Sequence, residues 1–180
     1  MQKELAAMVK AIGSICIVVG CSMIGIIANR RLREHVLVLQ DLIAVIQTIE
    51  SEISSQLSSI PTALQMALNA SGSKNSACTA FIRSILIGLE MRGPHVFPEI
   101  WRSAAEETLE ILSDRERNML NELADKLGRY GAEEQLSALR MVRSGLEHFL
   151  RTAEEERSRS GKVYLTLGTA LGLALAIILV

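Results

Sequence analysis

The chain has 180 residues and a formal net charge of −1, so its composition gives no basis for nucleic-acid binding. Only 3% of the residues are aromatic, whereas alanine, leucine, isoleucine and glutamate are abundant, which favours helices over β-sheets. The three cysteines are an odd number and have no partners at metal-ligand spacing, so a disulfide framework is not expected.

Two uncharged apolar runs, residues 11–28 and 163–180, lie near the two ends of the chain, and each covers eighteen residues. A helix of that length extends about 27 Å, close to the hydrocarbon thickness of about 30 Å in a typical bilayer. We therefore predict a transmembrane helix in each run, a short extracytoplasmic tail at residues 1–10, and one domain of ordinary size at residues 29–162.

Basic residues near the two runs predict the orientation of the chain. Six of them lie on the side of the middle segment, against only Lys3 and Lys10 on the other side. Because an excess of basic residues marks the cytoplasmic side, we predict an integral, two-pass protein of the cell membrane with a cytoplasmic middle domain and both termini outside. The six residues, which are also candidates for contact with anionic lipid headgroups, are Arg30, Arg31, Arg33, Arg157, Arg159 and Lys162.

Small residues four positions apart give each apolar run one narrow face: Cys21 and Gly25 in the first run, Gly168 and Gly172 in the second. Such faces let helix backbones approach closely in a membrane. We therefore predict that these four residues pack against another helix, which could be the other run, a second copy of the chain or another protein.

The first run also allows a different interpretation. Residues 18–21, Val-Val-Gly-Cys, fit a lipoprotein cleavage site after a basic region, and cleavage would leave an extracytoplasmic protein that is acylated and lipid-anchored at Cys21. The run continues beyond Cys21, however, and then meets three arginines, as a stop-transfer segment does. We favour the uncleaved helix and keep the lipid-anchored protein as the alternative.

Between the two runs, apolar residues recur at helical steps of three and four. No glycine or proline lies between Ala28 and Ile60, which predicts one long helix that leaves the membrane and becomes amphipathic. Further helices are predicted from Pro61, at Ser76–Met91, from Phe97, from Ser113, and from Ala132 into the second run. The expected fold is all-α: a cytoplasmic bundle of about six helices flanked by an N-terminal and a C-terminal transmembrane helix.

Local signals predict how one of these helices begins and ends. Ser113 and Glu116 have the spacing of a capping box, in which each residue satisfies a backbone N–H of the other. Gly128 and Gly131 are expected to end the helix, because glycine tolerates a left-handed backbone. Trp101, the single tryptophan, is predicted to lie in the core rather than in a ligand site.

No residue pattern indicates catalysis. The histidines, His35, His95 and His148, have no second histidine, cysteine or carboxylate at a usual metal-binding spacing. No glycine-rich loop connects a strand to a helix, so nucleotide binding has no support. The acidic pair Glu106 and Glu110 is typical of a solvated helix surface. We therefore expect no enzyme, cofactor or metal, and favour a binding or scaffolding role.

Several short stretches occur in the order found in a known family. They are the "IPTALQMAL" after the long helix, the "EIWRSAAEE" around the tryptophan, and the "KLGRYGAEEQ" near the predicted turn. With the run at each end, they make the chain resemble the stage III sporulation protein AB family of endospore-forming bacteria. In the last stretch, the residues that match the family are Leu127, Gly128 and Gln135.

The chain also departs from that family at the same turn. Gly131 stands where the family has an aspartate, and Ser137 and Ala138 replace its basic and histidine residues. The departure at Gly131 argues against a specific contact of the family at this turn, but it does not argue against the resemblance itself.

The resemblance implies a part in sporulation. The family belongs to an assembly in the mother-cell membrane around the engulfed forespore, where an ATPase and ring-forming proteins are thought to complete a secretion-like channel. It is also similar to the F-type inner-membrane platform proteins of type II secretion and type IV pili. The implied function is therefore a non-catalytic membrane platform that meets a cytoplasmic ATPase and other channel-complex proteins, with a homo-oligomer left open and no nucleic-acid partner.

Overall fold

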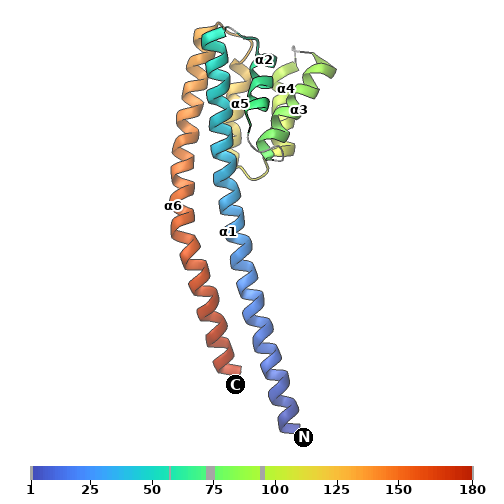
Figure 1. Cartoon of the computed structure of the whole chain (residues 1–180), viewed down its shortest axis with the longest axis vertical. Helices are drawn as coiled ribbons and strands as arrows, with labels where there is room; N and C mark the ends of the chain where they lie inside the picture. Colours follow the sequence, from blue (N-terminus) through green and yellow to red (C-terminus); the bar gives the residue numbers. More distant parts are fainter. Residues whose placement is uncertain (1, 57, 72–75, 94–95, 180) are drawn as a thin grey trace. The chain divides into compact units, whose positions relative to one another are not determined.

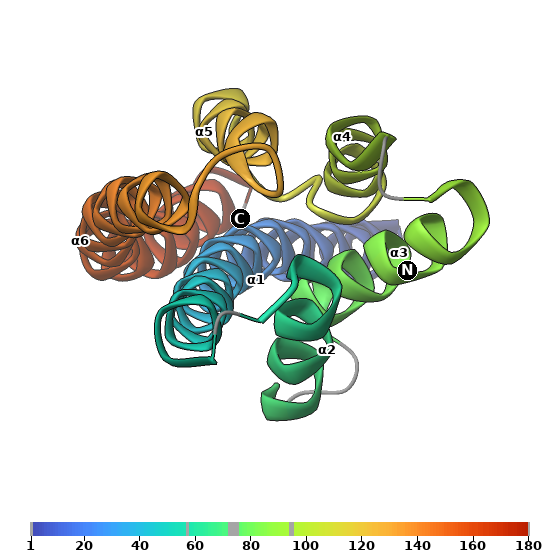
Figure 2. The same ribbon diagram turned by 90° about the horizontal axis from the view of Figure 1, so that it is seen from above.

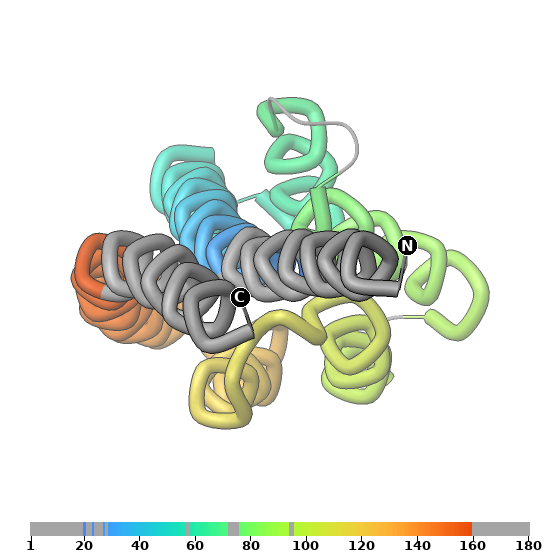
Figure 3. The backbone as a smooth tube through the Cα atoms, turned by 90° about the horizontal axis from the view of Figure 1, so that it is seen from below, coloured from blue at the N-terminus to red at the C-terminus, as the bar shows by residue number. Residues whose placement is uncertain are grey.

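The structure is a computed structural model that describes the backbone of residues 2–56, 58–71, 76–93 and 96–179. Side chains are described for those residues from 29 to 159 and for positions 20, 23 and 27, and Figure 3 shows this part of the chain in colour. The six helices, labelled in Figure 1, are α1 (Gln2–Gln56), α2 (Ile60–Ala70), α3 (Ala77–Arg92), α4 (Phe97–Thr108), α5 (Asp114–Lys126) and α6 (Ala132–Leu179).

The all-α prediction is confirmed, because every regular element in the described ranges is a helix and none is a strand. Helix starts follow the local signals closely: Pro61 and Pro98 lie in the first turns of α2 and α4, where a missing N–H costs nothing. Ser76 caps α3, its hydroxyl accepting from the backbone N–H of Thr79 at 3.2 Å.

The chain divides into two compact units. Residues 1–34 and 153–180 form one unit, and residues 35–152 form the other, which we call the helical unit. In the described part of the chain, no helix combines the length and the apolar character that crossing a membrane requires. Apart from positions 20, 23 and 27, the side chains of the two apolar runs, including those at Cys21, Gly25, Gly168 and Gly172, are not among the described ones, so the two transmembrane helices stay predictions.

Within the helical unit, α1 runs through the middle of the other helices, as the view in Figure 2 shows. The sequence predicts an apolar stripe along α1 that continues to Leu57 and Ile60. The stripe is buried as far as Ile53, Leu57 lies outside the described residues and Ile60 is half-buried. Leu42 and Val45, which lie off that stripe, are buried as well. The buried face is wider than the sequence pattern indicated because α1 has neighbours on several sides. The buried stripe residues are Val36, Leu39, Ile43, Ile46, Ile49 and Ile53.

The short helices pack around one aromatic cluster. Trp101 of α4 is 1% exposed, in agreement with its predicted place in the core, and its ring meets Phe81 of α3 edge-on at a centroid distance of 4.9 Å. Gly88 of α3 lies so close to Ile100 of α4 that a β-carbon at this position would clash with the Cγ2 atom of Ile100. The missing side chain therefore allows α3 and α4 to approach.

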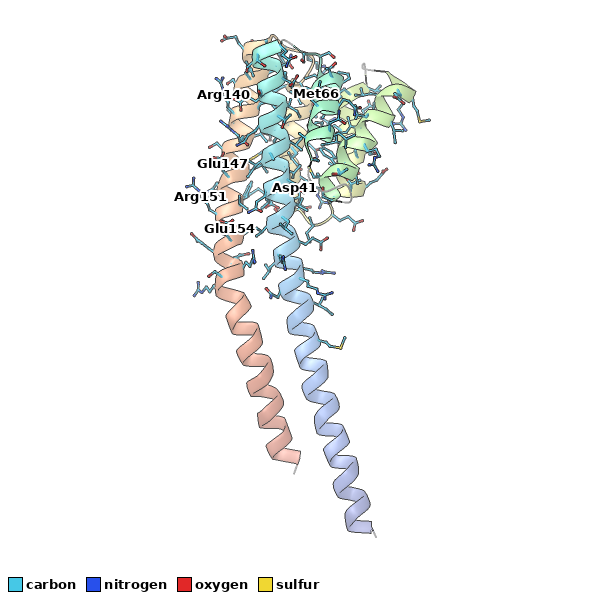
Figure 4. The ribbon with its side chains drawn as sticks, viewed as in Figure 1. Asp41, Met66, Arg140, Glu147, Arg151 and Glu154 are labelled. Carbon is cyan, nitrogen blue, oxygen red and sulfur yellow. The ribbon has the colours of Figure 1, made fainter. Side chains whose placement is uncertain are left out.

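Charged pairs join the outer helices at the surface. Glu50 of α1 is 15% exposed and accepts a hydrogen bond from Nε of Arg140 of α6 at 2.9 Å, with Arg143 3.6 Å away. Figure 4 labels Arg140 on α6. Arg102 of α4 pairs with Asp125 of α5 at 2.6 Å. Arg140 is 61% exposed, and Arg102 and Asp125 are both exposed by more than two fifths, so these two pairs contribute at most about 1 kcal/mol each.

A buried carboxylate joins α1 to α5. Glu116 is 3% exposed, and both of its oxygens lie 3.0 Å from Nε2 of His35 in α1. The predicted capping box is also present, since Glu116 accepts from the backbone N–H of Ser113 at 2.7 Å while the Ser113 hydroxyl accepts from the Glu116 N–H. Burial alone would raise the pKa of Glu116, but the hydrogen bonds from His35 and Ser113 outweigh it, and the pKa lies below its ordinary value.

The Glu116→Gln substitution is expected to destabilise the helical unit by about 1–3 kcal/mol near neutral pH, because it removes a buried charge-assisted contact. The lowered pKa means that ionised Glu116 stabilises the fold above its ordinary pKa of 4.5, and that this contribution is lost as the pH falls further. The wild-type unfolding free energy should therefore fall more steeply below that pH than that of the variant.

Urea titrations followed by the fluorescence of Trp101, which is buried in the helical unit, would measure both effects. Asp114→Asn is the matched control, because Asp114 begins the same helix but its side chain is 92% exposed in its pair with Arg117. Equal pH slopes for wild type and Glu116→Gln would contradict the prediction.

Candidate interaction cleft beside the turn between α5 and α6

The described residues hold no group of three or more metal-ligating side chains close enough to bind a metal ion. Cys78 is buried, and burial, assisted by the charge of Asp41, raises the pKa of its thiol to about 12, so it is no nucleophile at neutral pH. His35, which is isolated in the sequence, contacts the carboxylate of Glu116 through Nε2. The chemistry of these side chains therefore favours a binding surface as the candidate site.

A cleft of about 590 Å³ opens in the helical unit where several helix ends meet. Its apolar wall comes from four helices: Ile53 of α1, Leu89 of α3, Phe97 of α4, and Leu127 at the end of α5. Ile53, Phe97 and Leu127 are almost completely buried, so they form the floor, while Leu89 is half-buried. A volume of this size is within the range of ligand pockets.

The turn between α5 and α6 forms one side of the cleft. Gly128 has a left-handed backbone with φ of 75°, and its N–H donates to Oε1 of Gln135 at 3.3 Å. The same side chain donates from Nε2 to the carbonyl oxygen of Tyr130 at 2.7 Å. The side chain of Gln135 thus bonds to the turn at Gly128 and at Tyr130. Gln135 also lines the cleft together with Leu127 and Gly128.

The structure brings together the three residues that carried the family resemblance at this turn. Leu127, Gly128 and Gln135 all line the same cleft. The pairing of Gln135 with Gly128 crosses seven positions and a break between helices, so helical periodicity could not indicate it. The ordered short stretch was the only sequence signal for it.

The prediction for Gly131 is wrong. Its backbone is not left-handed, unlike that of Gly128. Gly131 instead precedes α6, where its carbonyl accepts from the Gln135 N–H at 3.1 Å and its own N–H donates to Oε2 of Glu134 at 3.1 Å. It therefore begins α6 as an N-cap rather than ending α5, and glycine is an acceptable residue there.

The rim of the cleft carries one cation. Arg129 is exposed there, and none of the described residues that line the cleft carries a carboxylate. The helices α2 and α4 begin at the cleft, while α5 ends there at Leu127, so helix ends of both polarities meet at it and the charge of the rim comes from Arg129. Acidic residues in the first turns of α4 and α6, such as Glu99 and Glu133, do not line it.

The basic residues predicted to face lipid headgroups all belong to the other unit. The side chain of Lys162 is not among the described ones. Asn29 of α1 lines the same surface hollow as Glu154, Arg157 and Ser158 of α6. The two helices are therefore adjacent at this level, and their basic residues occur together. Those with described side chains, all exposed, are Arg30, Arg31, Arg33, Arg157 and Arg159.

Replacing Gly128 should show that the turn needs its left-handed backbone. We expect Gly128→Ala to destabilise the helical unit by about 1–2 kcal/mol, because a β-carbon disfavours that conformation. Gly128→Asn should cost less, since asparagine tolerates the left-handed region better. Urea titrations followed by Trp101 fluorescence would measure the unfolding free energy of both variants. Equal losses for alanine and asparagine would mean that crowding, and not the backbone angle, constrains this position.

Comparisons with known proteins identify the family and the fold. The family model for stage III sporulation protein AB matches residues 10–180. A solved structure of a stage III sporulation protein AB superposes with a TM-score of 0.59 at 18% identity, covering 70% of this chain and 98% of that one. At that identity the likeness shows a shared fold. A comparison with individually curated proteins found no match. The family match covers nearly the whole chain, so this sporulation-associated protein belongs to the stage III sporulation protein AB family.

Proposed function

We propose that the protein is a non-catalytic membrane platform or adaptor of a secretion-like sporulation channel in the mother-cell membrane, and that it couples to a cytoplasmic ATPase. The observation that supports the proposal is the cleft, because the family-matching residues Leu127, Gly128 and Gln135 gather at it. Family membership supports the sporulation context. Other channel-complex proteins and a second copy of the chain are further partners that this proposal allows.

The membrane part of the proposal rests on the two apolar runs and their flanks. The adjacent basic residues near Asn29 and Arg157 are what two neighbouring helices would present at the cytoplasmic headgroups. In this arrangement the chain crosses the membrane twice, and the helical unit is cytoplasmic. The faces of Cys21–Gly25 and Gly168–Gly172 would then pack within the bilayer.

The coupling part predicts a direct complex. The full chain, reconstituted in lipid nanodiscs, should retain the secretion-type ATPase made by the same sporulating cell, and empty nanodiscs should not. A functional coupling would also change the rate of ATP hydrolysis. If the reconstituted chain does not bind the ATPase, and crosslinking in sporulating cells finds no contact, the coupling is wrong.

Mass spectrometry of the mature N-terminus would test the topology against the lipid-anchored alternative. We expect the protein from the membrane fraction to retain residues before Cys21 and to carry no acyl group on that cysteine. A protein that begins at an acylated Cys21 would overturn the two-pass arrangement, because the helical unit would then lie outside the cytoplasm.

A further inference from the structure

We propose that the cleft between α2, α4 and the turn after α5 binds an acidic peptide segment of the partner protein, which inserts apolar side chains into the cleft and sets a carboxylate against Arg129. The proposal rests on the proposed function, in which the partner is the ATPase, and it specifies the chemistry of the contact.

The apolar half of the contact follows from the floor of the cleft. Ile53, Phe97 and Leu127 come from three different helices and together line a volume of about 590 Å³. Side chains that enter this space would leave water for an apolar wall, which is favourable at about 25 cal/mol per Å² of buried apolar surface. A segment with two or three apolar side chains matches the size of the cleft.

The charged half follows from the rim. Arg129 is exposed and forms no ion pair with another described residue, so its guanidinium can donate two hydrogen bonds to one carboxylate. The cleft has this cation and no carboxylate among its described lining residues. A basic segment would therefore meet only repulsion, and an acidic one is complementary.

The helix starts at the cleft distinguish a peptide from a free phosphate. A phosphate site at a helix N-terminus uses several backbone N–H donors together. Here Pro61 and Pro98 occupy the first turns of α2 and α4, and proline has no N–H. Both prolines line the cleft, so they remove donors and add apolar surface. This wall suits the side chains of a peptide better than a nucleotide or a phosphate.

The first experiment reverses one charge on each side of the turn. With the full chain in nanodiscs, Arg129→Glu should weaken binding of the purified ATPase at least tenfold. Lys126→Glu is the matched control: Lys126 is also exposed at the end of α5, but it lines a separate hollow with Tyr130 and Met141. Its effect should stay within twofold. A charge reversal of the contacting acidic residue of the ATPase should restore the binding of Arg129→Glu.

The second experiment fills the cleft. Ser59 is exposed on the rim and makes no side-chain cap to α2, so Ser59→Trp can extend a ring over the opening. We expect at least a tenfold loss of binding, whereas Ser55→Trp, exposed on α1 and not among the lining residues, should bind as wild type does. Circular dichroism would verify that each variant keeps its helix content.

The outcomes separate this proposal from the proposed function. If the ATPase binds wild type, Arg129→Glu and Ser59→Trp equally, the cleft is not the contact, while the coupling stands. If the wild-type chain binds no ATPase, both fail. A photo-crosslinking residue at position 59 identifies the occupant: an acidic segment of the ATPase supports the proposal, whereas a second copy of the chain or a lipid overturns it.

Discussion

The carboxylate of Glu116 fixes the start of α5, the helix that leads to the cleft. It accepts from Ser113, which fixes the start of α5, and it contacts His35, which attaches that start to α1. The helix α5 has 13 residues and extends about 20 Å, so its other end delivers the turn that lines the cleft. A shift of Glu116 would be carried along this helix, because a packed helix moves as a rigid element. The cleft therefore depends on a contact one helix length away.

At the far end of α5, the shape of the turn is set by contacts of the Gln135 side chain with the backbone. Gln135 binds the N–H of Gly128 and the carbonyl of Tyr130, so the turn is already formed in the free chain. The cleft floor is equally fixed, since its side chains belong to the core of the helical unit. A partner segment would then lose its own conformational freedom on binding but would not have to order this surface, which favours affinity.

The sequence predicted the features that depend on neighbouring residues. Proline at helix starts, the capping box of Ser113 and Glu116, and the apolar stripe of α1 are local patterns, and the structure has each of them. The contact of His35 with Glu116 joins residues 81 positions apart, and no periodicity indicates it. The cleft was equally hidden, because its walls come from helices distant in sequence. Gly131 was misinterpreted because two nearby glycines look alike, although only Gly128 has the left-handed backbone.

The departures from the family pattern now have a structural meaning. Gly131, which stands where the family resemblance expects an aspartate, does not line the cleft, and Glu134 supports the start of α6 by accepting from its N–H. Ser137 and Ala138 stand where the family resemblance expects basic and histidine residues, and both line a separate hollow beside Met141. The matches to the family thus face the cleft, whereas the departures avoid it. A partner that contacts only the cleft would not touch these replaced residues. Lys126 lines the same hollow as Ser137 and Ala138, whereas Arg129 lines the cleft, so only Arg129 would meet such a partner.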